Sequence, residues 1–142
     1  MRQSRRAAIL GLPSPVLARL VTSVKWHHSL PLVALSAGLL GAVLPLAHMK
    51  QVCDLAHAAG VPVHLDGARL FNAAHALGVP AKDVSQHADS VCFCVSKGLS
   101  APVGSVLCGS QAFIERARAH RRSIGGNMRQ AGPLAAAGIV AL

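Results

Sequence analysis

The chain has 142 residues, of which 52% are hydrophobic and 13% charged, with four cysteines and a formal net charge of +9. This apolar composition excludes an intrinsically disordered chain, and four cysteines are too few for a disulfide-rich scaffold. The length predicts a single domain with a hydrophobic core. A basic surplus is typical of nucleic-acid binding, anionic-membrane binding or organelle import, so its position along the chain matters.

The N-terminal third carries most of the positive charge. Residues 1–53 contain six Lys or Arg and no acidic residue, whereas residues 54–142 contain eight basic and five acidic residues. Residues 1–28 are rich in Arg, Ser and Ala, a composition typical of a mitochondrial presequence. The alternative is a disordered or spliced-in leader that carries no targeting signal. We therefore predict a divergent basic and apolar leader over residues 1–42.

An apolar run, LVALSAGLLGAVL, follows at residues 32–44 between Pro31 and Pro45. A helix needs about 20 residues to cross a bilayer, and this run is shorter. It predicts a buried segment or a weak membrane association rather than a membrane span.

Helical and strand patterns alternate from residue 46 onward. Apolar residues at helical spacing predict helices over residues 46–60, 67–78, 110–122 and 129–142. Ser110 is the expected cap of the third helix, and Pro133 interrupts the fourth early. Short apolar runs predict strands over residues 61–66, 90–96 and 103–109. This order indicates an α/β fold with a parallel or mixed sheet flanked by helices.

The cysteines and histidines do not predict a metal site. The chain contains no CxxC pair and no Cys/His group at zinc spacing. Alternation along the strand at 90–96 places Cys92 and Cys94 on one side, where a free cysteine most often behaves as a small core hydrophobe.

Two short segments place polar groups where α/β proteins build their sites. HLDGARL (64–70) has Asp66 at the end of a strand, then a glycine turn and an arginine at the start of a helix. FCVSKGLSAPVG (93–104) has Lys97 after another apolar strand. Ligands bind beyond the carboxyl ends of such strands, so we expect Asp66 and Lys97 to face one crevice. A lysine amine withdrawn from water is a candidate for Schiff-base chemistry.

These motifs carry a family resemblance. VHLDGARLFNAA, DSVCFCVSKGLSAPVGSVLCGS and GGNMRQAG, in this order, resemble the threonine aldolases among the fold-type-I pyridoxal phosphate (PLP) enzymes. The resemblance covers residues 43–142, so relative to that family the chain looks truncated at both ends. It implies part of the PLP-binding large domain. It also implies a carbon–carbon lyase that cleaves L-threonine or L-allo-threonine to glycine and acetaldehyde, a step in threonine catabolism and glycine formation.

The resemblance also implies residue roles. Lys97 would hold PLP covalently, and Asp66 would pair with its pyridine nitrogen and keep it protonated. Ser96 would donate a hydrogen bond to the cofactor phosphate, and Arg69 would clamp the substrate carboxylate. Arg129, in GGNMRQAG, would serve the phosphate side or a subunit contact. The family further implies a homo-oligomer that acts on a small amino-acid substrate. From the residue patterns we also expect no metal, no nucleic acid and no membrane span.

Two other functions stay open. The first is an inactive aldolase fragment that acts as a partner of a full-length homologue. The second is a basic module for nucleic acid or anionic membrane, based on residues 2–25 and 116–122, although one Trp, three Phe and no Tyr offer few stacking platforms. The family favours the cytosol, and the acid-free leader favours the mitochondrial matrix.

Overall fold

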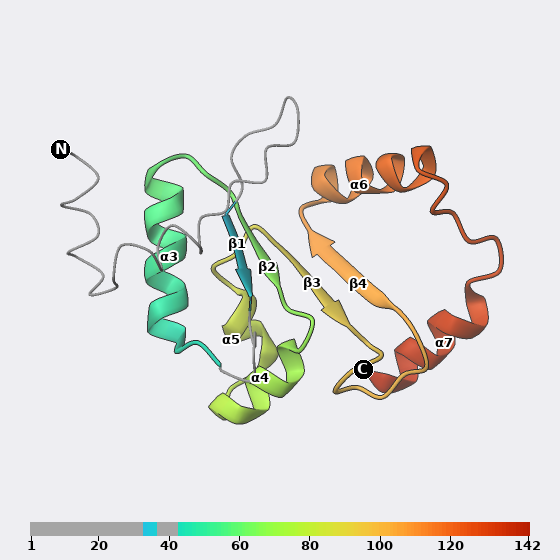
Figure 1. Cartoon of the computed structure of the whole chain (residues 1–142), viewed down its shortest axis with the longest axis horizontal. Coiled ribbons are helices and arrows are strands. Elements are labelled where there is room, and N and C mark those ends of the chain that lie inside the picture. The colour runs from blue at the N-terminus through green and yellow to red at the C-terminus, as the bar shows by residue number, and fades with distance from the viewer. Residues whose placement is uncertain (1–32, 37–42) are drawn as a thin grey trace.

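The computed structural model of the protein describes residues 33–36 and 43–142 (Figure 1). Its centre is a four-stranded sheet in the order β1-β2-β3-β4, built from β1 (Val33–Ser36), β2 (Val63–Asp66), β3 (Ser90–Cys94) and β4 (Ser105–Gly109). The first three strands are parallel, and β4 runs antiparallel to β3. The fold is therefore a mixed α/β architecture, as the sequence predicts.

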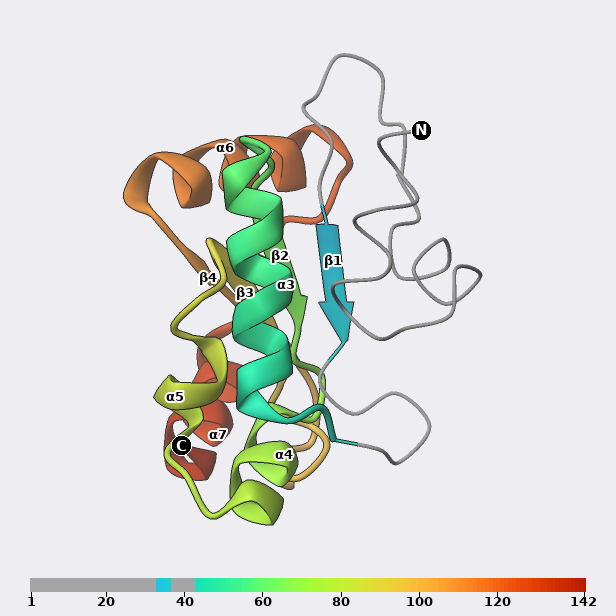
Figure 2. The same ribbon diagram turned by 90° about the vertical axis from the view of Figure 1, so that its left-hand side faces the viewer.

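Helices connect the parallel strands and continue beyond β4. They are α3 (Leu46–Ala58), α4 (Leu70–Leu77), α5 (Ala81–Ser85), α6 (Gln111–Ser123) and α7 (Gly132–Ala141). Helix α3 links β1 to β2, and α4 with α5 links β2 to β3. Figure 2 shows α3 running along the sheet in front of the strands, and its strand neighbour is β2. None of the helices described here is long and apolar enough to cross a membrane.

The hydrophobic core lies between the sheet and helices α3, α4 and α5. Alternation along β2 directs Val63 and Leu65 into this core, where they are 0% and 1% exposed. Phe93 of β3 enters from the next strand and meets Phe71 of α4 edge to face, with ring centroids 5.4 Å apart. The buried helical residues are Met49, Cys53 and Ala56 of α3, Leu70, Ala73 and Ala74 of α4, and Val84 of α5.

The opposite face of the sheet carries polar and thiol side chains. His64 and Asp66 alternate with the core residues of β2, and the register pairs them with Ser90 and Cys92 of β3. Cys94 follows on the same side of β3, as alternation predicts, but both strand thiols are only partly buried rather than part of the core. This second face is therefore the polar one, and Asp66 lies at its carboxyl edge.

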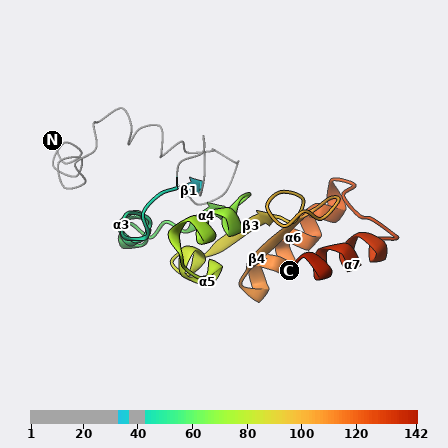
Figure 3. The same cartoon turned by 90° about the horizontal axis from the view of Figure 1, so that it is seen from below.

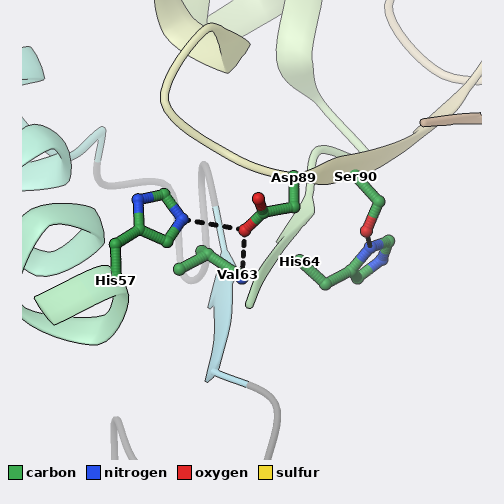
Figure 4. Close-up of polar contacts among 5 residues, drawn as sticks. All are labelled: His57, Val63, His64, Asp89 and Ser90. Carbon is green, nitrogen blue, oxygen red and sulfur yellow. Dashed lines mark hydrogen bonds and ion pairs between the residues drawn. The ribbon is translucent and has the colours of Figure 1, made fainter. Parts of the chain in front are cut away.

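A carboxylate fastens helix α3 to the amino ends of the strands (Figure 4). Asp89 Oδ2 accepts a 2.7 Å hydrogen bond from the Val63 N–H and lies 2.8 Å from His57 Nε2. The hydrogen bond from the Val63 N–H and, to a smaller extent, the one with His57 hold the pKa of Asp89 below its ordinary value. The contact fixes the start of β2 against the last turn of α3.

The C-terminal part is built differently. In residues 103–142 no side chain is buried, and all five residues of β4 are exposed. Figure 3 shows α6 and α7 beside β4, away from α3. Ser110 caps α6 as predicted, because its Oγ accepts the Phe113 N–H at 3.3 Å. One residue of α7, Ala141, packs partly against the core.

Several boundaries differ from the sequence prediction. The turn at residues 67–69 delays α4 to Leu70, and Pro133 stands at the first turn of α7 instead of interrupting a helix. The short helix α5 was not predicted, because its five residues show no full period of apolar spacing. Strand β1 lies in the apolar run at 32–44 and within the predicted leader 1–42, whose boundary stays a prediction. The rest of that leader falls outside the described residues.

Candidate functional site

Asp66 ends β2 and begins the turn into α4. Its Oδ1 accepts a 3.2 Å hydrogen bond from the Ala68 N–H two residues on, a contact that short Asp side chains make in turns. The side chain is exposed at the carboxyl edge of the sheet. Asp66 is therefore both a turn former and an exposed carboxylate at the edge where α/β proteins bind ligands.

Gly67 brings this turn directly onto β3. Its N–H donates a 2.8 Å hydrogen bond to the Cys92 carbonyl oxygen. A Cβ built on Gly67 would stand 2.9 Å from the same oxygen, closer than real Cβ atoms approach. Only glycine fits this backbone contact, so the Asp66 turn has a fixed position relative to β3.

The Lys97 loop follows β3 and closes on its own backbone. Val95 is buried; its N–H donates to the Gly104 carbonyl at 3.1 Å and its carbonyl accepts the Ala101 N–H at 2.9 Å. Ser100 donates its N–H to the Lys97 carbonyl at 3.0 Å and has a φ of 59°, an uncommon value for a residue with a side chain. These bonds order the loop that carries Lys97.

The Lys97 loop also packs closely against α4. A Cβ on Gly98 would overlap the side-chain amide of Asn72. The two sequence motifs are thus held together at one edge of the sheet, through Gly67 against β3 and through Gly98 against α4. Asp66, Ser96 and Lys97 all occupy this edge, as the parallel arrangement of their strands requires.

The two arginines are placed differently. Arg69 is exposed at the start of α4, and its carbonyl accepts the Ala73 N–H at 3.0 Å. Arg129 is exposed in the turn between α6 and α7. The ion pairs found within residues 43–142, Lys50–Asp54 and His57–Asp89, involve neither arginine. Arg69 therefore lies near the Asp66 edge because it follows Asp66 closely in the chain. No hydrogen bond or ion pair among the described residues connects Arg129 to that edge.

Lys97 differs from expectation in one respect. Its side chain is exposed, so the part of the chain that is described does not withdraw the amine from water. The loop ends in a Pro/Gly segment at the sheet edge, and Asn72 of α4 packs against it at Gly98. Shielding of the amine therefore needs groups beyond residues 33–36 and 43–142.

The polar face holds two contacts that sequence reasoning missed. His64 Nδ1 lies 2.9 Å from Ser90 Oγ across the β2–β3 register, and burial lowers the pKa of His64 (Figure 4). Cys92 Sγ donates to Asp66 Oδ1 at 3.8 Å. Alternation assigned Cys92 to a face, but only the pairing of β2 with β3 shows which residue it meets. No group of metal-ligating residues exists within the described ranges.

Comparison with known families gives one match. A model described as beta-eliminating lyase covers residues 16–142, beginning upstream of the segment that carries the motifs. Among curated proteins, the chain is 54% identical to the probable low-specificity L-threonine aldolase 2 of Arabidopsis thaliana over 102 residues, which is 72% of this chain and 29% of that protein. It is 47% identical to the low specificity L-threonine aldolase of Escherichia coli K12, covering 72% and 31%.

Solved structures agree with this fold. A putative aromatic amino acid beta-eliminating lyase/threonine aldolase from Exiguobacterium sp. 255-15 superposes with a TM-score of 0.72 at 27% identity, over 76% of this chain and 31% of that one. A putative L-allo-threonine aldolase from Listeria monocytogenes EGD-E gives 0.75 at 22% identity, over 82% and 33%, and this second likeness concerns the fold alone.

The length of these matches limits which properties of the relatives can be assigned to this chain. The chain spans about 30% of the length of the curated relatives it matches, so their activities are not carried over whole. The family model, by contrast, covers most of this chain and includes both motifs. The chain therefore belongs to the beta-eliminating lyase family, in which its relatives are low-specificity threonine aldolases.

Proposed function

We propose that this chain carries the cofactor-holding edge of a threonine aldolase, which cleaves the Cα–Cβ bond of L-threonine or L-allo-threonine to give glycine and acetaldehyde. Enzymes of this family depend on PLP. The observation that supports the proposal most is the joining of the Asp66 turn and the Lys97 loop at one sheet edge by two glycine contacts. The parallel strands bring the two motifs to the same edge, and the close glycine contacts hold them at a fixed separation, as a cofactor site requires.

The groups at this edge fit PLP chemically. PLP presents a pyridine nitrogen, an aldehyde and a phosphate, and the edge offers a carboxylate, a primary amine and a hydroxyl from Asp66, Lys97 and Ser96. Asp66 Oδ2 accepts no hydrogen bond from any described residue, which leaves a lone pair for a pyridinium N–H. When bound, PLP supplies the electron sink for the pair released as the Cα–Cβ bond breaks.

Each side chain then has one task. The Lys97 amine would hold the cofactor covalently, and the Asp66 carboxylate would pair with its pyridine nitrogen and keep that nitrogen protonated. The Ser96 hydroxyl donates a hydrogen bond to the phosphate. The Arg69 guanidinium, whose fork matches a carboxylate, orients the substrate. Arg129 would serve the phosphate side or a subunit contact, although no described bond connects it to the edge.

Borohydride trapping tests the proposal. We expect the purified full chain, mixed with PLP and reduced, to carry a stoichiometric adduct on the tryptic peptide that contains Lys97. Lys97→Ala should abolish the adduct, whereas Lys82→Ala, which removes an exposed lysine of α5, should leave it unchanged. Equal labelling of Lys50, Lys82 and Lys97 would refute a cofactor site at this edge.

The substrate assignment has its own test. A chain loaded with PLP should release acetaldehyde from L-threonine and L-allo-threonine, measured by its reduction with alcohol dehydrogenase and NADH. Arg69→Lys keeps the positive charge but loses the two-pronged geometry, so we expect KM for the amino acid to rise more than kcat falls. An unchanged KM would remove Arg69 from the substrate site.

A second function is favoured by the exposed C-terminal part. Apolar side chains there are uncovered in the described chain, among them Val106 and Leu107 of β4 and Ile139 and Val140 of α7. Solved relatives are about three times as long as the region they share with this chain, so they contain additional chain able to cover an equivalent surface. We propose as the alternative that a full-length aldolase chain covers it, with this chain as an inactive partner.

Co-expression with a tagged full-length relative separates the two functions. The partner function predicts stoichiometric co-elution that is lost in Leu107→Asp and kept in Leu55→Asp, a similarly exposed leucine on the remote helix α3. Circular dichroism of both variants would control for folding. Elution of the chain alone, together with an adduct at Lys97, would exclude the partner function.

A further inference from the structure

The two oxygens of the Asp66 carboxylate have different surroundings. Both hydrogen bonds that it accepts from the described residues end on Oδ1: one from the Ala68 N–H at 3.2 Å and one from the Cys92 thiol at 3.8 Å. A carboxylate held by a single contact at one oxygen can swing about its χ2 bond. Two donors from different directions at the same oxygen restrict that rotation.

The thiol that makes this contact is placed by the backbone. Asp66 and Cys92 are Cα partners in the parallel β2–β3 register, so their side chains leave the same face of the sheet. The hydrogen bond from the Gly67 N–H to the Cys92 carbonyl, 2.8 Å long, fixes the two residues at the point where β2 ends. The distance between thiol and carboxylate therefore follows from the sheet.

The chemistry of the thiol agrees with a donor role. Burial and, secondarily, the negative charge of Asp66 raise the pKa of Cys92. The thiol consequently stays protonated at neutral pH, and a protonated thiol can donate to a carboxylate oxygen whereas a thiolate would repel it. Cys92 is thus unsuited to nucleophilic chemistry here and suited to orienting its neighbour.

We propose that Cys92 is a positioning residue for the cofactor: its thiol holds Oδ1 of Asp66 so that Oδ2 is presented to the pyridine nitrogen. This inference rests on the proposed function, in which Asp66 pairs with PLP. Cys92 itself touches neither cofactor nor substrate; it acts through the carboxylate. The polar face of β3 thereby gains a role that the motif residues alone do not reveal.

The contact can be tested without PLP. Iodoacetamide alkylation of each cysteine, followed by peptide mass spectrometry at several pH values, reports the availability of each thiolate. Asp66→Asn removes the neighbouring charge, so we expect alkylation of Cys92 at pH 8 to accelerate severalfold, while Cys108, which is exposed on β4, keeps its rate. An unchanged Cys92 rate would mean that thiol and carboxylate do not interact, and would overturn the inference.

The consequence for the cofactor needs three variants. Cys92→Ala should weaken PLP binding severalfold and shift the pH profile of its visible absorption, because Asp66 is less well oriented. Cys92→Ser retains a hydroxyl donor and should restore both properties. Cys94→Ala, which removes the other partly buried thiol of the same strand face, should change neither.

The outcomes distinguish this inference from the proposed function. Normal PLP affinity and an unchanged absorption profile in Cys92→Ala would overturn the positioning role and leave the cofactor site intact. Failure of the unmodified chain to bind PLP would refute the proposed function, and the positioning role with it. Weakened binding in both Cys92→Ala and Cys92→Ser would assign the effect to packing and likewise overturn a role as donor.

Discussion

Residues 43–101 and residues 103–142 have similar secondary structure content but different burial. The first region contains every buried hydrophobic side chain of the described chain, from Met49 to Ala101. The second contains a strand and two helices, yet leaves Val140 88% and Ile139 74% exposed. Formed hydrogen-bonded elements are therefore not evidence of a core, and stability should come almost entirely from the first region.

The candidate site follows the same division. Asp66, Lys97 and their glycine contacts belong to the packed region, where backbone bonds and buried neighbours fix them. Arg129 belongs to the uncovered region and has no bond to the site among the described residues. A cofactor site requires side chains held in fixed positions, and among the described residues only the packed region 43–101 provides them.

Paired leucines should give the largest contrast. Leu65 is 1% exposed in the core, whereas Leu107 of β4 is 39% exposed. Leu65→Ala should lower the free energy of unfolding by about 2–5 kcal/mol, while Leu107→Ala should stay within about 0.5 kcal/mol, since it leaves no buried cavity. Urea denaturation followed by circular dichroism measures both. Equal losses would show that β4 is as deeply covered as β2.

Paired glycines should sharpen the contrast at intermediate size. Gly67→Ala forces a Cβ to within 2.9 Å of a backbone oxygen and should cost about 1–3 kcal/mol. Gly138→Ala, in α7, meets no atom within 4 Å and should stabilise the chain by roughly 0.5–1 kcal/mol through helix propensity. Thermal melts would record opposite shifts of Tm. A destabilising Gly138→Ala would reveal a neighbour packed on α7.

The smallest effect should appear at Asp89. Because its pKa is lowered in the folded state, the ionised carboxylate stabilises the fold above its ordinary value of 3.8, and this contribution disappears as pH falls through the folded value. The carboxylate is 49% exposed, so solvent screening limits the contribution to about 1 kcal/mol. The stability difference between the unmodified chain and Asp89→Asn should shrink below pH 4 in acid titrations. A difference independent of pH would locate the effect in packing.

Periodicity and motif spacing predict much of this molecule. Helical spacing of Met49, Cys53 and Ala56 identified the buried face of α3, and alternation identified the two faces of β3. The order of elements predicted the α/β class, and the Asp66 and Lys97 motifs predicted their common sheet edge. These features depend on local pattern, which a single sequence contains.

Features that depend on neighbours in space were not predictable in the same way. The contact of Cys92 with Asp66 requires the register of two strands separated by 26 positions in the chain. The lack of burial in β4 and α7 contradicts their apolar composition, because burial depends on what covers an element and not on its own residues. The short helix α5 has too few residues for its pattern to be recognised.

The strand order has a consequence for how the chain assembles. Because β1, β2, β3 and β4 neighbour one another in the order in which they are synthesised, each new strand pairs with the one made immediately before it. Pairing with the preceding strand keeps each connection as short as a parallel crossover allows, which limits the entropy cost of closing the loop. A nascent chain leaving the ribosome can therefore pair each of these four strands with the strand that precedes it, without waiting for residues further along the chain.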